Sequence, residues 1–385
     1  MGQLIRKIVI TSLCLILTSC VVIIKNEDNK SSDDSINGPL HFIDSVEIPR
    51  GAVQDGYQIG GLSSLYFDSV TNQLATISDD TSVTGTPRMH IFDIGLSTSG
   101  LHISPNKAIA LTNELGESFQ PDETIDAEAF DRLSNGNWVL SSEGIMLKDR
   151  FTKPQLLEFS PIGELVKRWP FPETYLPDLS ESPSTGIRSN AGFEGLHMSP
   201  NKQNLFLATE LALLQDGEVS TYDASSLTRI IHMKPDGEFF QVREEYLYPL
   251  SKMPNFGAED DVFKLIGISD IMAVSNNRLL VLERSYTAGV VNRNTVQIFI
   301  VDLDRNTIHR SEEGSGQQKV LVKRLWVDMD SFLNVPEFPR IDNIEGMILG
   351  PVLENGNQSL ILISDNNFSA RQKTLFYAFE ILTNL

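Results

Sequence analysis

Acidic residues recur at the two ends of a repeated pair of short apolar segments. In one copy, Glu194 stands at the start of the first segment and Glu210 directly follows the second. The same two positions in other copies hold Glu128 with Glu143 and Glu345 with Asp365. Several carboxylates brought together suit a hard, oxygen-binding cation such as calcium. A cation of this kind can hold a phosphate or polarise a phosphoryl oxygen and generate a nucleophilic water.

The two-segment pattern occurs five times along the chain. The copies are Ser63-Ser64-Leu65 to Asp79, Glu128-Ala129-Phe130 to Glu143, Glu194-Gly195-Leu196 to Glu210, Ser269-Asp270-Ile271 to Glu283, and Glu345-Gly346-Met347 to Asp365. Their third positions are separated by 65, 66, 75 and 76 residues. A unit that recurs at a near-constant interval, in a chain that otherwise consists of short strands and turns, predicts a β-propeller.

Hairpin pairing would bring the acids together. In an antiparallel hairpin the first residue of one strand lies beside the last residue of the next, so Glu194 should meet Glu210. If the five hairpins are the inner strands of blades, these ends converge around a central channel. Like charges in a narrow channel repel, so the ring of acids needs a bound cation, protonated members or arginine partners.

We therefore predict a divalent cation, with calcium as the first choice, bound by the carboxylates of this ring. The predicted ligands are Glu128, Glu143, Glu194, Glu210, Glu283, Glu345 and Asp365. The predicted catalytic residues are Glu194, Glu345 and Arg284. The alternative is that the acids are structural and bind backbone amides or arginine side chains across the blades.

Other polar residues near the repeats have two readings each. Arg284 and Arg371 could present forked donors to a phosphate or could partner the acids. Asn190 and Asn343 suit turns as well as ligand binding, and His197 suits a packed core better than catalysis. The chain lacks a Gly-x-Ser-x-Gly elbow, a His-Glu-x-x-His motif, paired cysteine motifs and a phosphate-binding glycine loop.

The strand pattern predicts an all-β propeller with five four-stranded blades. The second blade, for example, reads as strands at 125–130, 138–141, 155–159 and 165–169. The fifth blade lacks an outer strand, and Leu40 to Ile48 can supply it by pairing with Leu375 to Ile381, which closes the ring and removes exposed edges. Long connections, which would emerge on the acid-bearing face, leave six blades as an alternative; they are 112–124, 171–192, 250–267 and 328–342.

The N-terminus has the features of a targeting segment. Arg6 and Lys7 precede the apolar run from Ile8 to Leu17, which is too short to span a bilayer. The tetrapeptide that ends in Cys20 resembles a bacterial lipobox, although an ordinary signal peptide with a chance cysteine is the alternative. We expect a signal peptide at 1–19, a lipidated Cys20 with a flexible tether at 20–39, and a domain at 40–385. The expected location is extracytoplasmic, on the outer membrane where the cell has one.

Composition restricts the partners. The formal net charge of −20 over 385 residues argues against binding nucleic acid or docking directly on anionic lipid. Cleavage would remove Cys14 and leave Cys20 as the single cysteine, so no intramolecular disulfide is expected. We expect a monomer that contacts the membrane through its lipid and binds a small phosphorylated molecule.

The repeats resemble a known family. The similarity rests on Gly60-Gly61-Leu62-Ser63, Asp126-Ala127-Glu128, Asn190-Ala191-Gly192-Phe193-Glu194-Gly195-Leu196, Leu282-Glu283-Arg284, Asp342-Asn343-Ile344-Glu345-Gly346-Met347 and Leu362-Ile363-Ser364-Asp365-Asn366-Asn367-Phe368. These segments look like the bacterial phytase-like family, whose domain is described as having esterase-like activity of phytase. The resemblance covers roughly residues 45–382 and implies a propeller outside the cytoplasm. It favours a phosphoester hydrolase, and a non-catalytic, membrane-tethered binding propeller is the second hypothesis.

Overall fold

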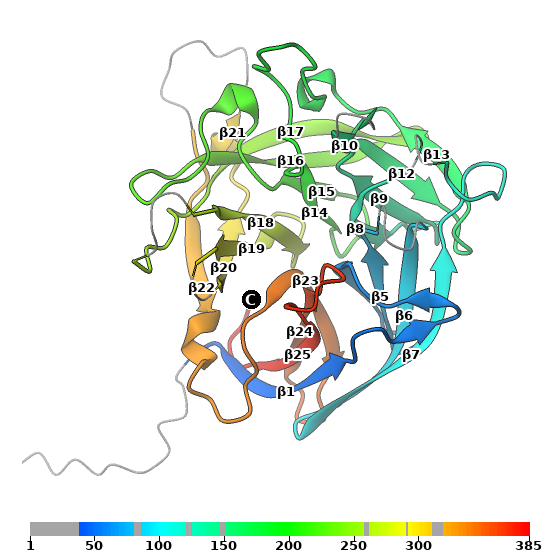
Figure 1. Ribbon diagram of the computed structural model, residues 1–385, viewed down its shortest axis with the longest axis vertical. Helices are drawn as coiled ribbons and strands as arrows, with labels where there is room; N and C mark the ends of the chain where they lie inside the picture. The colour runs from blue at the N-terminus through cyan, green and yellow to red at the C-terminus, as the bar shows by residue number, and fades with distance from the viewer. Residues whose placement is uncertain are drawn as a thin grey trace, which may run out of the picture. The chain divides into compact units, whose positions relative to one another are not determined.

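Five antiparallel sheets surround a common centre in the computed structural model (Figure 1). The structure describes residues 38–80, 86–120, 123, 125–146, 151–257, 262–289, 292–309 and 319–385. The predicted signal peptide, Cys20 and the predicted tether up to residue 37 lie outside these residues. No helix in the described part is both long and apolar enough to cross a membrane.

Each of these five sheets is one blade. Within a blade the strands lie side by side, from the innermost strand at the centre to the outermost strand at the rim. Blade 1 contains β4 (Leu62–Asp68), β5 (Gln73–Ser78), β6 (Arg88–Ser97) and β7 (Gly100–Ala110). Blade 2 contains β8 (Ala127–Arg132), β9 (Trp138–Ser142), β12 (Gln155–Phe159) and β13 (Leu165–Trp169). Blade 3 contains β14 (Phe193–Met198), β15 (Leu205–Thr209), β16 (Leu227–Asp236), β17 (Phe239–Pro249) and β21 (Ile308–His309).

The remaining blades complete the circle. Blade 4 contains β18 (Lys264–Ala273), β19 (Arg278–Thr287), β20 (Arg293–Asp302) and β22 (Lys323–Asp328). Blade 5 contains β23 (Asn343–Val352), β24 (Gln358–Asp365), β25 (Thr374–Ile381) and β1 (Leu40–Ile48). Short elements fill the connections: β2 (Val53–Gln54), β3 (Tyr57–Gln58), β10 (Ile145–Met146), β11 (Phe151–Thr152), and the 3₁₀ turns η1 (Glu173–Tyr175), η2 (Leu214–Asp216), η3 (Arg305–Thr307) and η4 (Met329–Phe332).

The predicted closure of the ring is confirmed. Strand β1 pairs antiparallel with β25, from Leu40 opposite Ile381 to Ile48 opposite Thr374. Every residue of β25 is buried, because this strand has a neighbouring strand on each side and a sheet packed on each face. Five blades are therefore present, as predicted, and the six-blade alternative is not needed for the described residues. Blade 3 differs from the prediction because the short β21 pairs with the outer edge of β17.

A β-bulge interrupts the inner hairpin of each blade at the same place. The register shifts between Ala127 and Ala129 in blade 2, so Glu128 is the extra residue. The corresponding extra residues are Glu194 in blade 3, Ser269 in blade 4 and Glu345 in blade 5, and blade 1 shifts across Ser64 and Leu65. A bulge re-aims the side chain of its extra residue. The repeated glutamates therefore turn out of the ladder at the end of the strand where the blades meet.

The glycine after two of these glutamates allows neighbouring blades to approach. A Cβ on Gly346 would lie 2.9 Å from Ser64 Cα in blade 1. A Cβ on Gly195 would lie 3.0 Å from the backbone nitrogen of Ile271 in blade 4. Real Cβ atoms essentially never come as close as the Gly346 distance, and the Gly195 distance is tighter than most, so the Glu-Gly pairs mark positions where one inner strand passes directly against the next.

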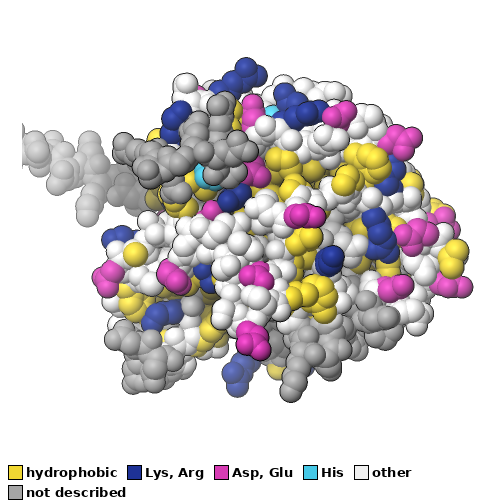
Figure 2. Space-filling view, turned by 90° about the horizontal axis from the view of Figure 1, so that it is seen from above, with side chains coloured by type: hydrophobic (Ala, Val, Ile, Leu, Met, Phe, Trp, Pro, Cys, Tyr) yellow, Lys and Arg dark blue, Asp and Glu magenta, His cyan; other side chains and the backbone are white. Residues whose placement is uncertain are grey.

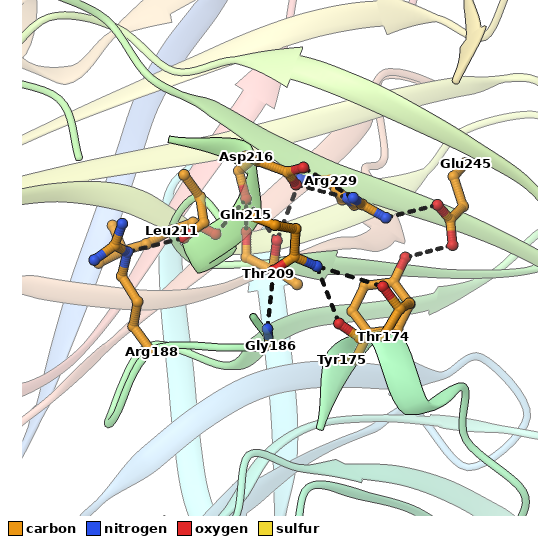
Figure 3. Close-up of polar contacts among 12 residues, drawn as sticks. Thr174, Tyr175, Gly186, Arg188, Thr209, Leu211, Gln215, Asp216, Arg229 and Glu245 are labelled. Atoms are coloured by element: carbon orange, nitrogen blue, oxygen red, sulfur yellow. Dashed lines mark hydrogen bonds and ion pairs between the residues drawn. The ribbon is translucent and has the colours of Figure 1, made fainter. Parts of the chain in front are cut away.

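A buried ion-pair network anchors the long connection 171–192 (Figure 3). Arg229 of β16 donates two hydrogen bonds to Asp216, at 2.6 and 2.8 Å, and one to Glu245 at 2.8 Å. The Tyr175 hydroxyl donates to the other oxygen of Glu245 at 2.7 Å, and Tyr175 is fully buried. The donors and acceptors match one another, so this network holds the connection against blade 3.

The surface carries both signs of charge. On the face drawn in Figure 2, Lys and Arg side chains lie among Asp and Glu side chains and scattered hydrophobic atoms. A single large field of one sign is not visible on this face.

Candidate functional site

The ends of the inner hairpins line one cavity of about 850 Å³. Its lining includes Ser63, Asp79, Asp126, Glu128, Glu143, Asn190, Glu194, Glu210, Arg284, Tyr286, Arg293, Asn294, Asp330, Arg340, Asn343, Glu345 and Arg371. These residues come from all five blades and from the connections that lead into β18 and β23. The predicted convergence of the hairpin ends on one site is what the geometry shows.

Three carboxylates of blade 2 form an acidic cluster within this cavity. Oxygen atoms of Asp126, Glu128 and Glu143 all lie within 4.8 Å of one another. Glu128 and Glu143 are buried, with 8% and 3% of their surface exposed. An all-oxygen set at this spacing matches the chemistry that a hard divalent cation requires. The residues present therefore fit such an ion.

Burial and mutual repulsion disfavour ionisation in this region. Burial raises the pKa of Glu143 to about 7, against one opposing hydrogen bond from the Gly192 amide. Burial, followed by the neighbouring Glu194 and Asp126, raises the pKa of Glu128 well above its usual range. The carboxylates of the acidic cluster therefore repel one another when they are ionised, and a bound cation would reduce this repulsion.

Arg284 compensates the acids on the opposite side. Its Nη1 lies 3.2 Å from Glu345 Oε1, and its Nη2 lies 3.9 Å from Glu210 Oε1. Nη1 also donates to the Asn343 side-chain oxygen, and the Asn343 amide donates to Glu345 Oε1 at 2.7 Å. Burial still raises the pKa of Glu345 to about 7 and that of Glu210 to about 8.

The cavity is therefore divided by charge. Among the described residues that line it, all Lys and Arg side chains come from blade 4 or from segments next to blade 5; we call Arg284, Arg293, Arg340 and Arg371 the arginine wall. The lining contributed by blades 1 to 3 contains carboxylates and small polar groups. Arg284 partners acids of blades 3 and 5, whereas the carboxylates of the acidic cluster in blade 2 are spaced so that they could hold a metal ion.

Two of the predicted ligands lie outside the cavity lining and are engaged elsewhere. Glu283 accepts hydrogen bonds from Tyr248 at 2.7 Å and from the Lys323 ammonium group. Asp365 accepts from the backbone amides of Leu62 at 2.8 Å and Asn367 at 2.7 Å, which uses both of its oxygens. These two acids hold strands and blades together, so we do not include them among the ligands proposed below.

The other predicted ligands all line the cavity. They are Glu128, Glu143, Glu194, Glu210 and Glu345. Glu143 also joins two blades, because its Oε2 accepts from the Gly192 amide at 2.7 Å. The alternative that the acids are structural and bind backbone amides across the blades therefore holds for part of this ring. One acid, such as Glu143, can both bridge two blades and bind a cation.

The remaining candidates fall into two groups. Arg371 and Asn190 line the cavity, and Asn190 has a positive φ of 52°, as a turn residue does. His197 is not part of the lining; its Nδ1 lies 2.7 Å from the Met198 carbonyl, and burial lowers its pKa. This environment agrees with the reading of His197 as a packed histidine.

Sequence reasoning missed Asp126 and Asp79 as site residues. Asp126 lies two residues before Glu128, and this spacing places both side chains on one side of an extended chain. Asp79 occupies the blade 1 position that Glu143 occupies in blade 2, so the repeat itself marked it. Both signals were in the sequence. Arg293 and Arg340 carried no comparable signal, because their approach to the cavity depends on the blade 4 and blade 5 connections.

Two solved structures align with most of this chain at low sequence identity. A mannose phosphorylase from Leishmania mexicana aligns over 88% of each chain with 8% identity and a TM-score of 0.45. A putative glycosidase from Bacteroides thetaiotaomicron aligns over 91% of this chain and 96% of its own, with 10% identity and a TM-score of 0.44. No curated protein sequence matches the chain. The family model described as "Phytase-like: Esterase-like activity of phytase" matches residues 57–368. The chain therefore belongs to the phytase-like family.

Proposed function

We propose that this protein is an extracytoplasmic, metal-dependent phosphoester hydrolase that acts on a small phosphorylated substrate. The observation that carries the proposal is the division of one cavity into the acidic cluster of blade 2 and the arginine wall of blades 4 and 5. A divalent cation on the first surface and guanidinium groups on the second would contact a phosphate from two sides.

The proposed cation ligands are Asp126, Glu128 and Glu143, with Glu194 beside them. We take calcium as the first choice because the donors are all carboxylate oxygens. A cation bound there supplies positive charge that offsets the negative charge of a phosphoryl group. Arg284 lines the cavity, and 17% of its side-chain surface is exposed. Its guanidinium can therefore donate to phosphoryl oxygens while it remains beside Glu345.

The hydrolysis needs one proton acceptor and one proton donor. A bond forms between the water oxygen and phosphorus while the bond between phosphorus and the ester oxygen breaks. Burial, followed by Glu210 and Glu143, raises the pKa of Glu194 well above its usual range, which favours the protonated form of this side chain. We assign Glu194 to protonate the leaving oxygen and Glu345, with a pKa of about 7, to accept the proton that the water loses.

The test uses the full chain in detergent after removal of metal with a chelator. Release of phosphate from a panel of phosphomonoesters should depend on added calcium, magnesium or manganese. Glu128→Gln and Glu194→Gln should abolish it, whereas Glu238→Gln should not, because the Glu238 side chain is 82% exposed and lies away from the cavity. A panel with no metal-dependent phosphate release would refute the enzymatic proposal.

A non-catalytic, ligand-binding propeller is the second candidate. It is favoured by the acids that bridge blades, namely Glu143 on the Gly192 amide and Asp365 on the Leu62 amide. Under this hypothesis a cation would raise the melting temperature but no ester would be cleaved.

We further propose that lipid on Cys20 tethers the protein to the outer membrane, as a monomer that binds no nucleic acid. The proposal rests on the sequence features of residues 1–20 and on the net charge of −20.

A further inference from the structure

Four buried side-chain atoms on the blade 4 side of the cavity have no hydrogen-bond partner in the described part of the chain. They are Arg284 Nε, Glu345 Oε2, Asn294 Oδ1 and Asp330 Oδ1. Each belongs to a residue that lines the cavity. Buried polar atoms in folded proteins are nearly always paired, so four unpaired atoms on residues that line one cavity favour a ligand on this side of it.

The chemical type of these atoms restricts that ligand. Asp330 Oδ2 is already bound by Arg293 at 2.7 Å, which leaves Oδ1 as an acceptor that requires a donor. Glu345 Oε1 takes the hydrogen bond from Asn343, so Oε2 is the free oxygen of that carboxyl group. A phosphate oxygen in its ionised form only accepts hydrogen bonds and cannot satisfy Asp330. A hydroxyl group can donate to Asp330 and can either donate to or accept from Glu345.

An apolar surface lies beside these atoms. The rings of Phe263 and Tyr286 have their centroids 6.1 Å apart, and both side chains line the same cavity with Leu265. The ring of a sugar presents C–H groups on its faces and hydroxyl groups around its edge. Aromatic side chains next to unpaired carboxylate oxygens match that combination.

We propose that the substrate is a sugar or polyol that carries a phosphate and several free hydroxyl groups. This inference rests on the proposed function, in that the phosphate lies between the acidic cluster and Arg284. The hydroxyl groups then bind Asp330 and Asn294, and Glu345 Oε2 stays available to accept the proton of the water. A polyol whose hydroxyl groups are all phosphorylated leaves these acceptors without donors and adds anionic groups next to two carboxylates.

The experiment measures binding separately from turnover. Full-length Glu194→Gln protein, in which turnover should be abolished, is titrated with saturating calcium in a calorimeter with a hexose 6-phosphate, phenyl phosphate, inositol hexakisphosphate and inorganic phosphate. The hexose phosphate should bind more tightly than phenyl phosphate or inorganic phosphate by on the order of tenfold or more, because two or more hydroxyl hydrogen bonds are added. Equal or tighter binding of phenyl phosphate or inositol hexakisphosphate would overturn the inference, as would no binding of the hexose phosphate.

Two variants locate the effect. Asp330→Ala and Asn294→Ala should weaken hexose phosphate binding on the order of tenfold relative to inorganic phosphate binding. Asp302→Ala is the matched control, because Asp302 forms a similar pair with Arg278 at 2.6 Å in the same blade, outside the cavity. Asp330→Asn keeps the shape of the side chain and serves if Asp330→Ala does not fold. An equal loss for both ligands would contradict the assignment.

The two hypotheses fail in different ways. Hexose phosphate that binds selectively but releases no phosphate supports the hydroxyl site and refutes the hydrolase. Phosphate release without any preference for hydroxyl-bearing esters supports the hydrolase and refutes the hydroxyl site.

Discussion

Arg284 of blade 4 lies 3.2 Å from Glu345 of blade 5, and this pair joins the two blades inside the cavity. The Glu345 side chain is 11% exposed and the Arg284 side chain 17% exposed, so water screens the pair little. Arg284 also faces Glu210 of blade 3 at 3.9 Å. One guanidinium therefore stabilises three blades at the point where their inner strands meet.

Removal of Arg284 should be strongly destabilising. Arg284→Ala leaves Glu345 and Glu210 buried without their cation, a change that costs about 3–5 kcal/mol for buried pairs. Urea unfolding should show this loss, and adding Glu345→Gln should recover part of it. The exposed pair of Arg278 with Asp302 is the control, since Arg278→Ala should cost about 1 kcal/mol or less. Equal losses for both arginines would contradict this account.

Stability without metal should fall as pH rises. Burial raises the pKa of Glu143 and Glu345 to about 7 and that of Glu210 to about 8, all above the ordinary glutamate value. Between pH 5 and pH 8 the unfolded chain has already lost these protons while the folded chain still holds them, so the free energy of unfolding decreases. Thermal melts of metal-stripped protein across this range should show it. A melting temperature that rises from pH 5 to pH 8 would contradict the prediction.

Calcium should stabilise the protein through the acidic cluster. An ion that binds only the folded state adds about 2.7 kcal/mol at a hundredfold excess over its dissociation constant. Glu128→Gln and Asp126→Asn should reduce the resulting rise in melting temperature. Glu283→Gln should leave the rise intact, because Glu283 is engaged by Tyr248 and Lys323 outside the cavity. An unchanged calcium response in both cluster variants would place the ion elsewhere.

The glycine after the bulged glutamate should resist substitution. Gly346→Ala places a Cβ 2.9 Å from Ser64 Cα, and such overpacking costs about 1–3 kcal/mol. Gly95→Ala is the control, because the nearest atom to its Cβ, His102 Cβ, lies at an ordinary 3.6 Å. Urea unfolding of both variants should separate them by at least about 1 kcal/mol. If Gly346→Ala is as stable as Gly95→Ala, the inner strands do not pack as closely as described.

Lipid attachment should depend on Cys20. Cys20→Ala should move the protein from the membrane fraction to the soluble extracytoplasmic fraction, whereas Cys14→Ala should not. Mass spectrometry of the mature N-terminus measures the acyl chains directly. A Cys20→Ala protein that stays in the membrane fraction would argue for an ordinary uncleaved or otherwise retained segment.

The sequence predicted the fold well because strand patterns are local. The strands at 155–159 and 165–169 have the predicted bounds, and so does the closing strand Leu40–Ile48. The meeting of the hairpin ends was also predictable, since antiparallel pairing fixes which residues share an end. The bulges at Glu128, Glu194 and Glu345 were not predictable from alternation, because one extra residue barely changes the pattern.

The roles of individual acids were harder to predict. Glu283 and Glu210 occupy the same position in the repeat, yet Glu283 lies beside Lys323 and Glu210 lines the cavity. The difference arises from β22, a strand of blade 4 that follows Glu283 by about forty residues. The repeat shows which positions the blades have in common. Which acid is neutralised depends on partners that are specific to one blade, such as Lys323 beside Glu283.

The pairing of β1 with β25 also constrains how the molecule can be made. Leu40 and Ile381 are partners although 341 residues separate them. During synthesis, β1 can therefore form its pair only after β25 has been made. Until then the growing chain has two open sheet edges, which are sites for association with other chains. Loss of β25 would leave β1 and β24 with no shared neighbour. A premature stop codon anywhere before β25 should therefore leave a chain that cannot close its ring of blades.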